Sequence, residues 1–371
     1  MISYWEQTAL LHTDIAVIGG GITGLSTALS LRARFPNHSI IVFERGLLPS
    51  GASTRNAGFA CFGSLTELID DSRTLTRQQA LELAAMRFNG LQRLRQRCSD
   101  AAIDYTQRGS FELLQQGDEG ALNALEDWNS TLQPLLGGRA FSVSKQKPAE
   151  KGFSNQITVL IENHYEGELH SGKLMRRLTE LCRLNNIDIR TGTEIIQIEE
   201  EANEMILLLN GYRFKAGQVV HCTNAFAGAL LPQLAVTPGR GQVLITHPVP
   251  GLRFKGIYHF EAGYFYFREI DGRVLFGGGR NLDFAGETTT LMGPNATIIS
   301  ALKDHLNHTI LPGINYTIDR QWSGIMAFGE HKIPLIQQVS PRQFICLRMG
   351  GMGVALASEA GEQVAALFPE L

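Results

Sequence analysis

The stretch Asp14-Ile-Ala-Val-Ile18-Gly19-Gly-Gly21-Ile-Thr-Gly24 decides the fold of this chain. Residues 14–18 are short, apolar and rich in β-branched side chains, which predicts a buried strand. Apolar residues then recur at helical spacing from 22 to about 34, where Phe35-Pro36-Asn37 ends the helix. A second apolar strand follows at 39–44. Strand, glycine turn, helix and strand together form the βαβ unit of a parallel sheet.

The three spaced glycines fit the pattern G-x-G-x-x-G of dinucleotide sites. The first makes the tight turn, the second lets backbone N–H groups approach a pyrophosphate, and the third lets the helix pack on the strand. With 39 glycines in 371 residues, this spacing arises by chance roughly 0.4 times per chain, so only its context gives it weight. That context includes Glu44, an acid about 20 residues beyond Gly24 that can accept hydrogen bonds from ribose hydroxyls. We therefore predict a dinucleotide site that includes Gly19, Gly21, Ile22, Thr23, Gly24 and Glu44.

The rest of the chain alternates between α/β and antiparallel patterns. Helices are predicted at 77–98, 171–184 and 354–367, and strands at 187–190, 218–222 and 344–347. Aromatic-rich antiparallel strands are predicted at 242–246, 264–268 and 273–276. This order predicts an α/β chain, α+β overall, with a mainly antiparallel β-sheet substrate domain inserted into a Rossmann-like domain. The nucleotide domain would comprise 1–84, 155–238 and 320–371, and the substrate domain 85–154 and 239–319.

Composition excludes several classes of function. The net charge is −3 and basic residues form no long run, so we expect no nucleic-acid partner. The five cysteines have no CxxC spacing, which argues against a disulfide framework and a structural zinc site. His221, His259 and His331 show no metal spacing and are interpreted as structural or exposed, so no metal is predicted. No leader-like or membrane-spanning stretch is found, and we expect a cytoplasmic protein without membrane insertion.

Several segments carry a resemblance to a known family. The N-terminal stretch, Phe43-Glu44-Arg45 and Ser50-Gly-Ala-Ser-Thr-Arg-Asn-Ala-Gly58 together resemble the D-amino-acid-oxidase-like family of FAD-dependent oxidoreductases. That family includes glycine oxidase, sarcosine oxidase and the γ-glutamylputrescine oxidases. Further similarity lies at 167–174, 219–225, Trp322-Ser-Gly324, Pro334 and Gly350-Gly-Met-Gly353, and only about 85–165 carries no such motif.

The resemblance implies non-covalently bound FAD and assigns contacts to it, since no cysteine aligns with a covalent flavin link. Glu44 and Arg45 would meet the adenosine ribose, and Ile195 the adenine. A second turn before a helix, at 350–354, would approach the pyrimidine edge of the flavin, where N–H donors favour reduction. The remaining cofactor-binding residues implied are Ala52, Ser53, Asn56, Ala57, Gly58, Phe59, Thr223, Gly350, Gly351, Met352, Gly353 and Val354.

Departures from the family pattern bear on the substrate. In glycine-oxidase-like members an arginine that pairs with the substrate carboxylate lies two residues after W-x-G, but here that position is Met326. The lysine that follows the C-terminal glycines in sarcosine-oxidase-like members is replaced by Ala355. A bidentate arginine–carboxylate pair is hard to replace. An amine or a larger N-substituted substrate is therefore favoured over a small free α-amino acid. Arg268 and Arg280 are alternative carboxylate anchors, or else surface arginines.

The aromatic strand near residue 265 offers pocket candidates. Tyr264 and Tyr266 alternate with Phe265 and Phe267, so one pair faces the core, although the pattern does not say which. Substrate-pocket candidates are thus Tyr264, Tyr266, Arg268 and Met326, and no catalytic acid–base pair is identified. The favoured function is oxidation of a C–N bond by hydride transfer to flavin N5, with imine hydrolysis and with O2 or another electron acceptor. The alternatives are an NAD-linked dehydrogenase and a non-catalytic FAD-binding protein; the oligomeric state is left open.

Overall fold

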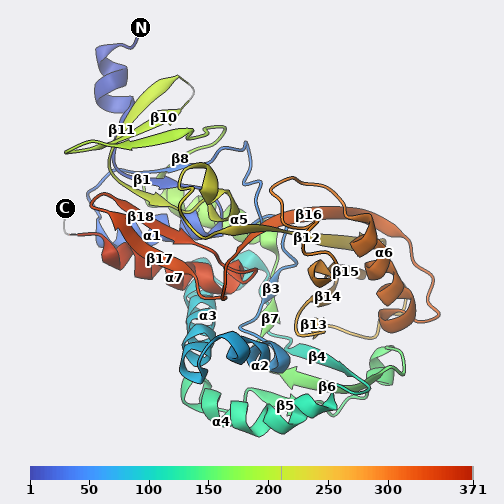
Figure 1. Cartoon of the computed structure of the whole chain (residues 1–371). Coiled ribbons are helices and arrows are strands. Elements are labelled where there is room, and N and C mark those ends of the chain that lie inside the picture. The colour runs from blue at the N-terminus through green and yellow to red at the C-terminus, as the bar shows by residue number, and fades with distance from the viewer. Residues whose placement is uncertain (210, 370–371) are drawn as a thin grey trace.

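Two eight-stranded sheets form the body of the molecule in its computed structural model, which describes residues 1–209 and 211–369 (Figure 1). The first sheet has a parallel centre in the order β18-β11-β1-β2-β8, with β17 antiparallel at one edge. A meander of β9 and β10 extends from β11. Its strands are β1 (His12–Ile18), β2 (Ile40–Phe43), β8 (Asp188–Arg190), β9 (Gln197–Glu200), β10 (Met205–Leu209), β11 (Tyr212–His221), β17 (Leu335–Ser340) and β18 (Gln343–Leu347).

Strand β1 is buried on both faces, which explains its unbroken apolar sequence. Ile15 and Val17 pack in the cluster formed by α1 (Ile22–Arg34), α3 (Arg77–Cys98), α5 (Ser171–Leu184) and α7 (Gly353–Leu367). Ala16 and Ile18 face the opposite way, into a second cluster built from the meander. The glycine turn at the end of β1 is thus held between two packed layers.

The second sheet has the order β16-β12-β15-β14-β13-β4-β6-β5 and is antiparallel except between β13 and β4. One face carries an aromatic core in which Tyr258 and Phe267 stack with ring centroids 4.9 Å apart, and α6 (Ala296–His305) covers it. The strands are β4 (Ser110–Gln115), β5 (Phe141–Val143), β6 (Ile157–Asn163), β12 (Thr237–Thr246), β13 (Ile257–Phe260), β14 (Phe265–Ile270), β15 (Arg273–Gly278) and β16 (Ile318–Phe328).

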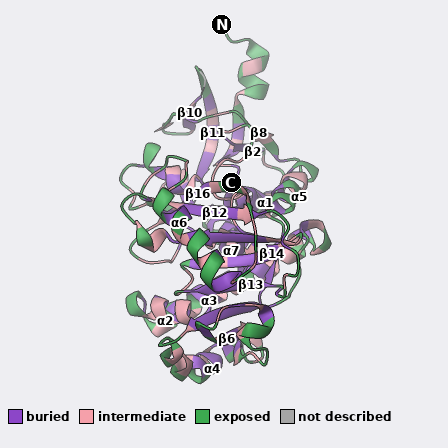
Figure 2. Ribbon diagram, turned by 90° about the vertical axis from the view of Figure 1, so that its right-hand side faces the viewer, coloured by how far each residue is buried: buried purple, intermediate pink, exposed green. Residues whose placement is uncertain are grey.

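Shorter elements connect and cover the two sheets. The helices α2 (Leu65–Thr74) and α4 (Leu125–Leu136) lie with α3 at the bottom of the view in Figure 1, and β3 (Phe59–Ala60) pairs with β7 (Gly167–Glu168) between the sheets. Buried residues follow the strands of both sheets, whereas the N-terminal helical turn stands away from the body and is largely exposed (Figure 2).

The predicted fold class is confirmed, and so are the predicted bounds of helices 22–34, 77–98 and 171–184. Strands β6 and β16, however, hydrogen-bond within the second sheet, although the predicted boundaries at 155 and 320 place most of their residues in the nucleotide domain. We therefore propose boundaries near 164 and 329. All five cysteines are buried and free. Among the described residues, no helix is both long and apolar enough to cross a bilayer.

Candidate functional site

The turn after β1 shows why its three spaced residues are glycines. Gly19 has a φ of 110°, and a Cβ there would lie 2.7 Å from the carbonyl oxygen of Cys222. A Cβ on Gly24 would lie 1.8 Å from the carbonyl oxygen of Gly19, so α1 packs on the turn only without a side chain. Gly21 has an ordinary φ of −76°, and a Cβ there would lie 2.7 Å from the Ser53 hydroxyl. Glycine is therefore needed at this position for the space that it leaves, and not for its backbone conformation.

Helix α1 begins without a side-chain cap at Gly21. Its first amide, of Ile22, donates to the Ser53 hydroxyl at 3.0 Å. By contrast, α2, α3, α5 and α6 each have a capping side chain, and α4, which also lacks one, contributes no residue to the cavity. The unpaired amides and the positive end of the helix dipole suit a pyrophosphate. The glycine turn therefore fits the phosphate part of a dinucleotide.

The end of β2 supplies the acid expected at the ribose. One carboxylate oxygen of Glu44 accepts from the amide of Gly20 at 2.9 Å and the other from Gly46 at 3.0 Å, which fixes the side chain at the cavity wall. The Arg45 guanidinium lies 3.8 Å from the ring centroid of Phe226, in the same wall. The buried Thr223 hydroxyl, which also lines the cavity, has no hydrogen-bond partner among the described residues. This end of the cavity thus offers a ready acceptor and an unsatisfied hydroxyl to an adenosine moiety.

The W-x-G segment on β16 clamps the loop between residues 50 and 58. The indole N–H of Trp322 donates to the carbonyl oxygen of Arg55 at 2.9 Å, and the Arg55 guanidinium donates back to the Ser323 carbonyl at 3.1 Å. A Cβ on Gly324 would lie 3.1 Å from the Arg55 Cβ. Asn56 closes the loop by accepting from the amide of Gly58 at 2.9 Å. Asn56 therefore shapes the loop besides lining the cavity.

The C-terminal glycine turn points at the same cavity. Gly350 and Gly351 have φ values of 56° and 85°, which glycine adopts readily. The side-chain oxygen of Asn224, at the end of β11, accepts from the amides of Arg348 and Met349 at 3.1 and 3.4 Å and ties the turn to the parallel sheet. Helix α7 then starts without a side-chain cap, so two uncapped helices face one cavity.

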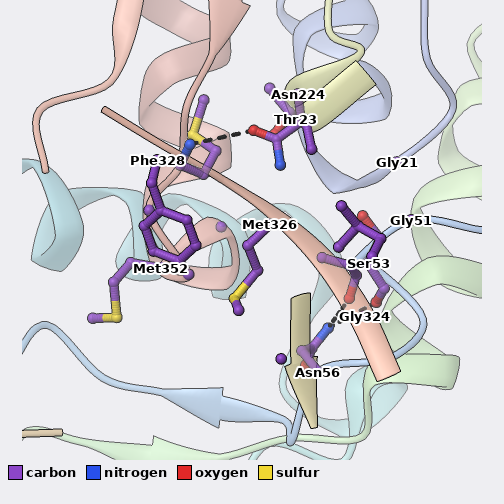
Figure 3. A pocket seen from close by; sticks show the side chains of 18 of the residues that line it. Gly21, Thr23, Gly51, Ser53, Asn56, Asn224, Gly324, Met326, Phe328 and Met352 are labelled. Carbon is purple, nitrogen blue, oxygen red and sulfur yellow. Dashed lines mark hydrogen bonds between the residues drawn. The ribbon is translucent and has the colours of Figure 1, made fainter. Parts of the chain in front are cut away.

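A cavity of about 940 Å³ joins these pieces (Figure 3). Its size is at the upper end of the range for ligand sites. The predicted cofactor residues Gly24 and Gly58 do not line it: Gly24 serves the packing of α1, and a Cβ on Gly58 would meet the Leu169 carbonyl oxygen at 2.2 Å. The predicted residues that do line it are Gly19, Gly21, Ile22, Thr23, Glu44, Arg45, Ala52, Ser53, Asn56, Ala57, Phe59, Ile195, Thr223, Gly350, Gly351, Met352, Gly353, Val354, Tyr264, Tyr266 and Met326.

The second sheet forms the far wall of the cavity. Tyr264 and Tyr266 line it, whereas Phe265 and Phe267 point into the aromatic core, which resolves the alternation left open by the sequence. His259 is also a lining residue and is buried, so its interpretation as structural or exposed was incomplete. Cys61, Glu67 and Phe328 belong to the wall as well, and no local sequence pattern marks them because they come from three separate segments.

Arg268 is not a pocket residue, which corrects the prediction. Its side chain is 6% exposed and donates to the carbonyl oxygens of Ala57, Gly58 and Leu169 at 3.4, 3.1 and 2.9 Å. Burial lowers the pKa of Arg268, while the nearby Glu168 opposes that shift. The guanidinium ties β14 to the loop of Gly58 and to β7, so it holds in place a loop that forms part of the cavity wall.

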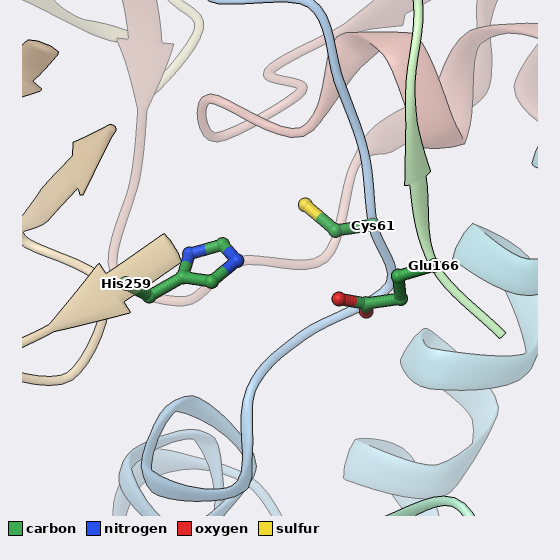
Figure 4. Close-up of side chains that lie close together, drawn as sticks. All are labelled: Cys61, Glu166 and His259. Atoms are coloured by element: carbon green, nitrogen blue, oxygen red, sulfur yellow. The ribbon is translucent and has the colours of Figure 1, made fainter. Parts of the chain in front are cut away.

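Three buried polar side chains meet beside the cavity (Figure 4). A ligand-type atom from each of Cys61, Glu166 and His259 lies within 4.8 Å of the other two. Burial raises the pKa of Glu166 to about 8, and it raises the pKa of Cys61 and lowers that of His259. At neutral pH all three groups are therefore mainly uncharged, and the trio forms a neutral polar patch.

We expect Glu166→Gln to flatten the decline of stability between pH 5 and pH 8. In the folded protein Glu166 keeps its proton up to about pH 8, whereas the unfolded chain releases it near 4.5, so this residue destabilises the fold as pH rises. Glutamine still accepts from the amides of Phe62 and Gly63, which bind one carboxylate oxygen at 2.7 and 3.0 Å.

Urea unfolding at the two pH values measures this effect. Relative to wild type, the variant should gain roughly 4 kcal/mol between pH 5 and pH 8, since each pKa unit corresponds to about 1.4 kcal/mol. Nearby Glu112, whose pKa burial raises to about 7, is present in both proteins, so the comparison of the two isolates the contribution of Glu166. Parallel pH profiles for the two proteins would contradict an uncharged Glu166.

Comparison with known proteins agrees with the geometry. The family model described as FAD dependent oxidoreductase (DAO) matches residues 14–367. A probable oxidoreductase, OrdL, of Rhizobium meliloti (strain 1021) is 25% identical over 95% of this chain and 82% of its own length. The gamma-glutamylputrescine oxidoreductase of Escherichia coli (strain K12) is 22% identical over 96% of this chain and 83% of its own.

Solved structures share the fold. Glycine oxidase from Geobacillus kaustophilus superposes with a TM-score of 0.76 at 20% identity, covering 96% of this chain and 94% of that one. L-proline dehydrogenase from P. horikoshii gives 0.77 at 19% identity, covering 96% and 93%. At such identities the likeness concerns the fold alone.

Proposed function

The chain belongs to the DAO family of FAD-dependent oxidoreductases, and we propose that it oxidises the C–N bond of an amine or N-substituted amino acid. Its cofactor is FAD, so an NAD-linked dehydrogenase is no longer an alternative. The observation that carries the proposal is a single cavity that joins the glycine turns of α1 and α7 to an aromatic wall of the second sheet.

The protein's part in the reaction is to bind the cofactor, to orient the substrate and to enclose both. The chemistry that a bound FAD would supply is that of an acceptor for the hydride equivalent of the carbon that bears the nitrogen, and the imine product would hydrolyse in water. The uncapped N-terminus of α7 offers a positive field that favours negative charge on the reduced cofactor. Tyr264, Tyr266, Met326 and Phe328 form a wall that orients the substrate and limits the access of water.

We assign the adenosine end of the cofactor to Glu44, Arg45, Ile195 and Thr223, and the pyrophosphate to the amides that follow Gly21. The loop of Ala52 to Phe59 and the turn of Gly350 to Val354 would hold the flavin. This assignment is supported by the unsatisfied Thr223 hydroxyl and by the two uncapped helices. The fold does not indicate the electron acceptor, because both an oxidase and a dehydrogenase share it.

The visible spectrum and an anaerobic substrate panel test the function. We expect the purified protein to show flavin absorbance and to be bleached by at least one secondary or primary amine, but not by the matched alcohol that lacks nitrogen. Air or an artificial acceptor, added afterwards, then tells an oxidase from a dehydrogenase. A flavin that stays oxidised with every amine and amino acid would leave the alternative of a non-catalytic FAD-binding protein.

A further inference from the structure

Arg280 places a positive charge in the substrate side of the cavity. It follows β15 in a short helical turn, directly after Gly279, whose φ is 76°. Its guanidinium carbon lies 3.8 Å from the ring centroid of Phe328 and 4.8 Å from that of Phe284. Two aromatic rings thus hold the cation at the cavity surface.

The Arg280 guanidinium lies over β12, the strand that pairs with the strand of Met326. Strand β12 pairs with both β15 and β16, and in this register Gly239 is opposite Met326. A Cβ on Gly239 would lie 3.0 Å from an Arg280 terminal nitrogen and 2.4 Å from Phe328. The Arg280 side chain therefore passes over Gly239 and reaches the wall that Met326 also lines.

No acidic partner is bound to Arg280 among the residues that the structure describes. The nearby acid Glu287 is bound by Arg240 at 2.8 Å and also by Gln242 and Asn295. Two other cations of this wall, Arg87 and Lys332, are both paired with Asp71. Burial lowers the pKa of Arg280, which an anionic ligand would offset.

We propose that Arg280 binds the carboxylate of the substrate, so that the substrate is an amine that carries a carboxylate group. That the substrate is an amine rests on the proposed function. That its anionic group binds to Arg280 does not depend on the proposed function. A half-buried guanidinium without a counter-charge is costly, and it offers five N–H donors in a fork that matches a carboxylate. The anchor comes from the turn after β15, and β12 lies between β15 and the strand β16 that carries Met326.

Benzoate binding to the holoprotein, followed by the flavin difference spectrum, tests the anchor without turnover. Arg280→Met should weaken benzoate binding about 30- to 100-fold, the loss expected for a charge-assisted pair. Arg280→Lys should lose less, because it keeps the charge but not the fork. The neutral isostere benzamide should bind all these proteins alike. Adding Met326→Arg to Arg280→Met should recover benzoate binding to within about tenfold of wild type.

Arg320→Met is the matched control, since Arg320 lies on β16 with 78% of its side chain exposed and outside this cavity. The proposal is overturned if the wild-type protein does not bind benzoate at tens of millimolar. It is also overturned if Arg280→Met binds benzoate with wild-type affinity, or if its affinity for benzamide falls as much as its affinity for benzoate. These outcomes are distinct from failure of the proposed function, which shows as a flavin that no amine bleaches. If no amine bleaches the flavin but benzoate binding still depends on Arg280, the carboxylate anchor is supported while the proposed function is not.

Discussion

Valine in place of Gly21 is expected to give a folded protein that has lost its FAD. The backbone at Gly21 has a φ of −76°, which any residue adopts, so the substitution introduces no backbone strain. The added side chain instead occupies the approach to the first amides of α1, and its Cβ would lie 2.7 Å from the Ser53 hydroxyl. Losing two charge-assisted hydrogen bonds to the pyrophosphate weakens binding by roughly 100-fold or more.

Flavin content after gel filtration measures this loss, with far-UV circular dichroism to check the fold. Gly120→Val is the matched control, because a Cβ there meets nothing within 4 Å and the residue lies outside the cavity. A double variant, Gly21→Val with Ser53→Ala, separates the two effects of the side chain. If the double variant regains FAD, the cause is the clash with Ser53, and blocked access to the pyrophosphate is not the explanation.

Local signals in the sequence predicted the two glycine turns that line the cavity. The glycine turn, Glu44 and the turn at 350–353 each depend on backbone geometry within a few residues, and such geometry leaves a mark in the sequence. The clamp between Trp322 and Arg55 spans more than 260 residues, and only the resemblance to a family indicated it. The predicted helix bounds were confirmed because caps, glycines and apolar periodicity are also local.

The substrate side depends on distant pairings, which a single sequence does not reveal. Arg268 lies within the hairpin of β14 and β15 and Arg280 lies just after it, yet Arg268 is buried outside the cavity and Arg280 lines it. Arg268 lies on the same face of β14 as Tyr266, but the loop of Gly58 and β7 cover it, whereas the turn at Gly278 and Gly279 directs Arg280 to the cavity. Likewise, Cys61, Glu166 and His259 meet only because three segments converge, so residue spacing gave no signal.

Arg268 is expected to be a structural residue, and its removal should cost stability more than substrate binding. Its guanidinium donates to four carbonyl oxygens at the junction of β14, the loop of Gly58 and β7, and it lies 3.7 Å from the Glu168 carboxylate. Methionine matches the volume but donates nothing. Glu168, 9% exposed, would keep only its contact with Arg108, whose side chain is 46% exposed. Breaking a buried pair of this kind costs about 3–5 kcal/mol.

Urea unfolding of Arg268→Met, with FAD in excess, measures this cost. Arg273→Met is the matched control on the neighbouring strand, because Arg273 is 28% exposed and bonds Asp319 at 2.7 Å where water screens the pair. There we expect a loss of about 1 kcal/mol or less. Benzoate affinity of the Arg268→Met holoprotein should stay within a few-fold of wild type, since Arg268 reaches no part of the cavity. A variant of normal stability that has lost benzoate binding would return Arg268 to the substrate site and contradict the assignment of that role to Arg280.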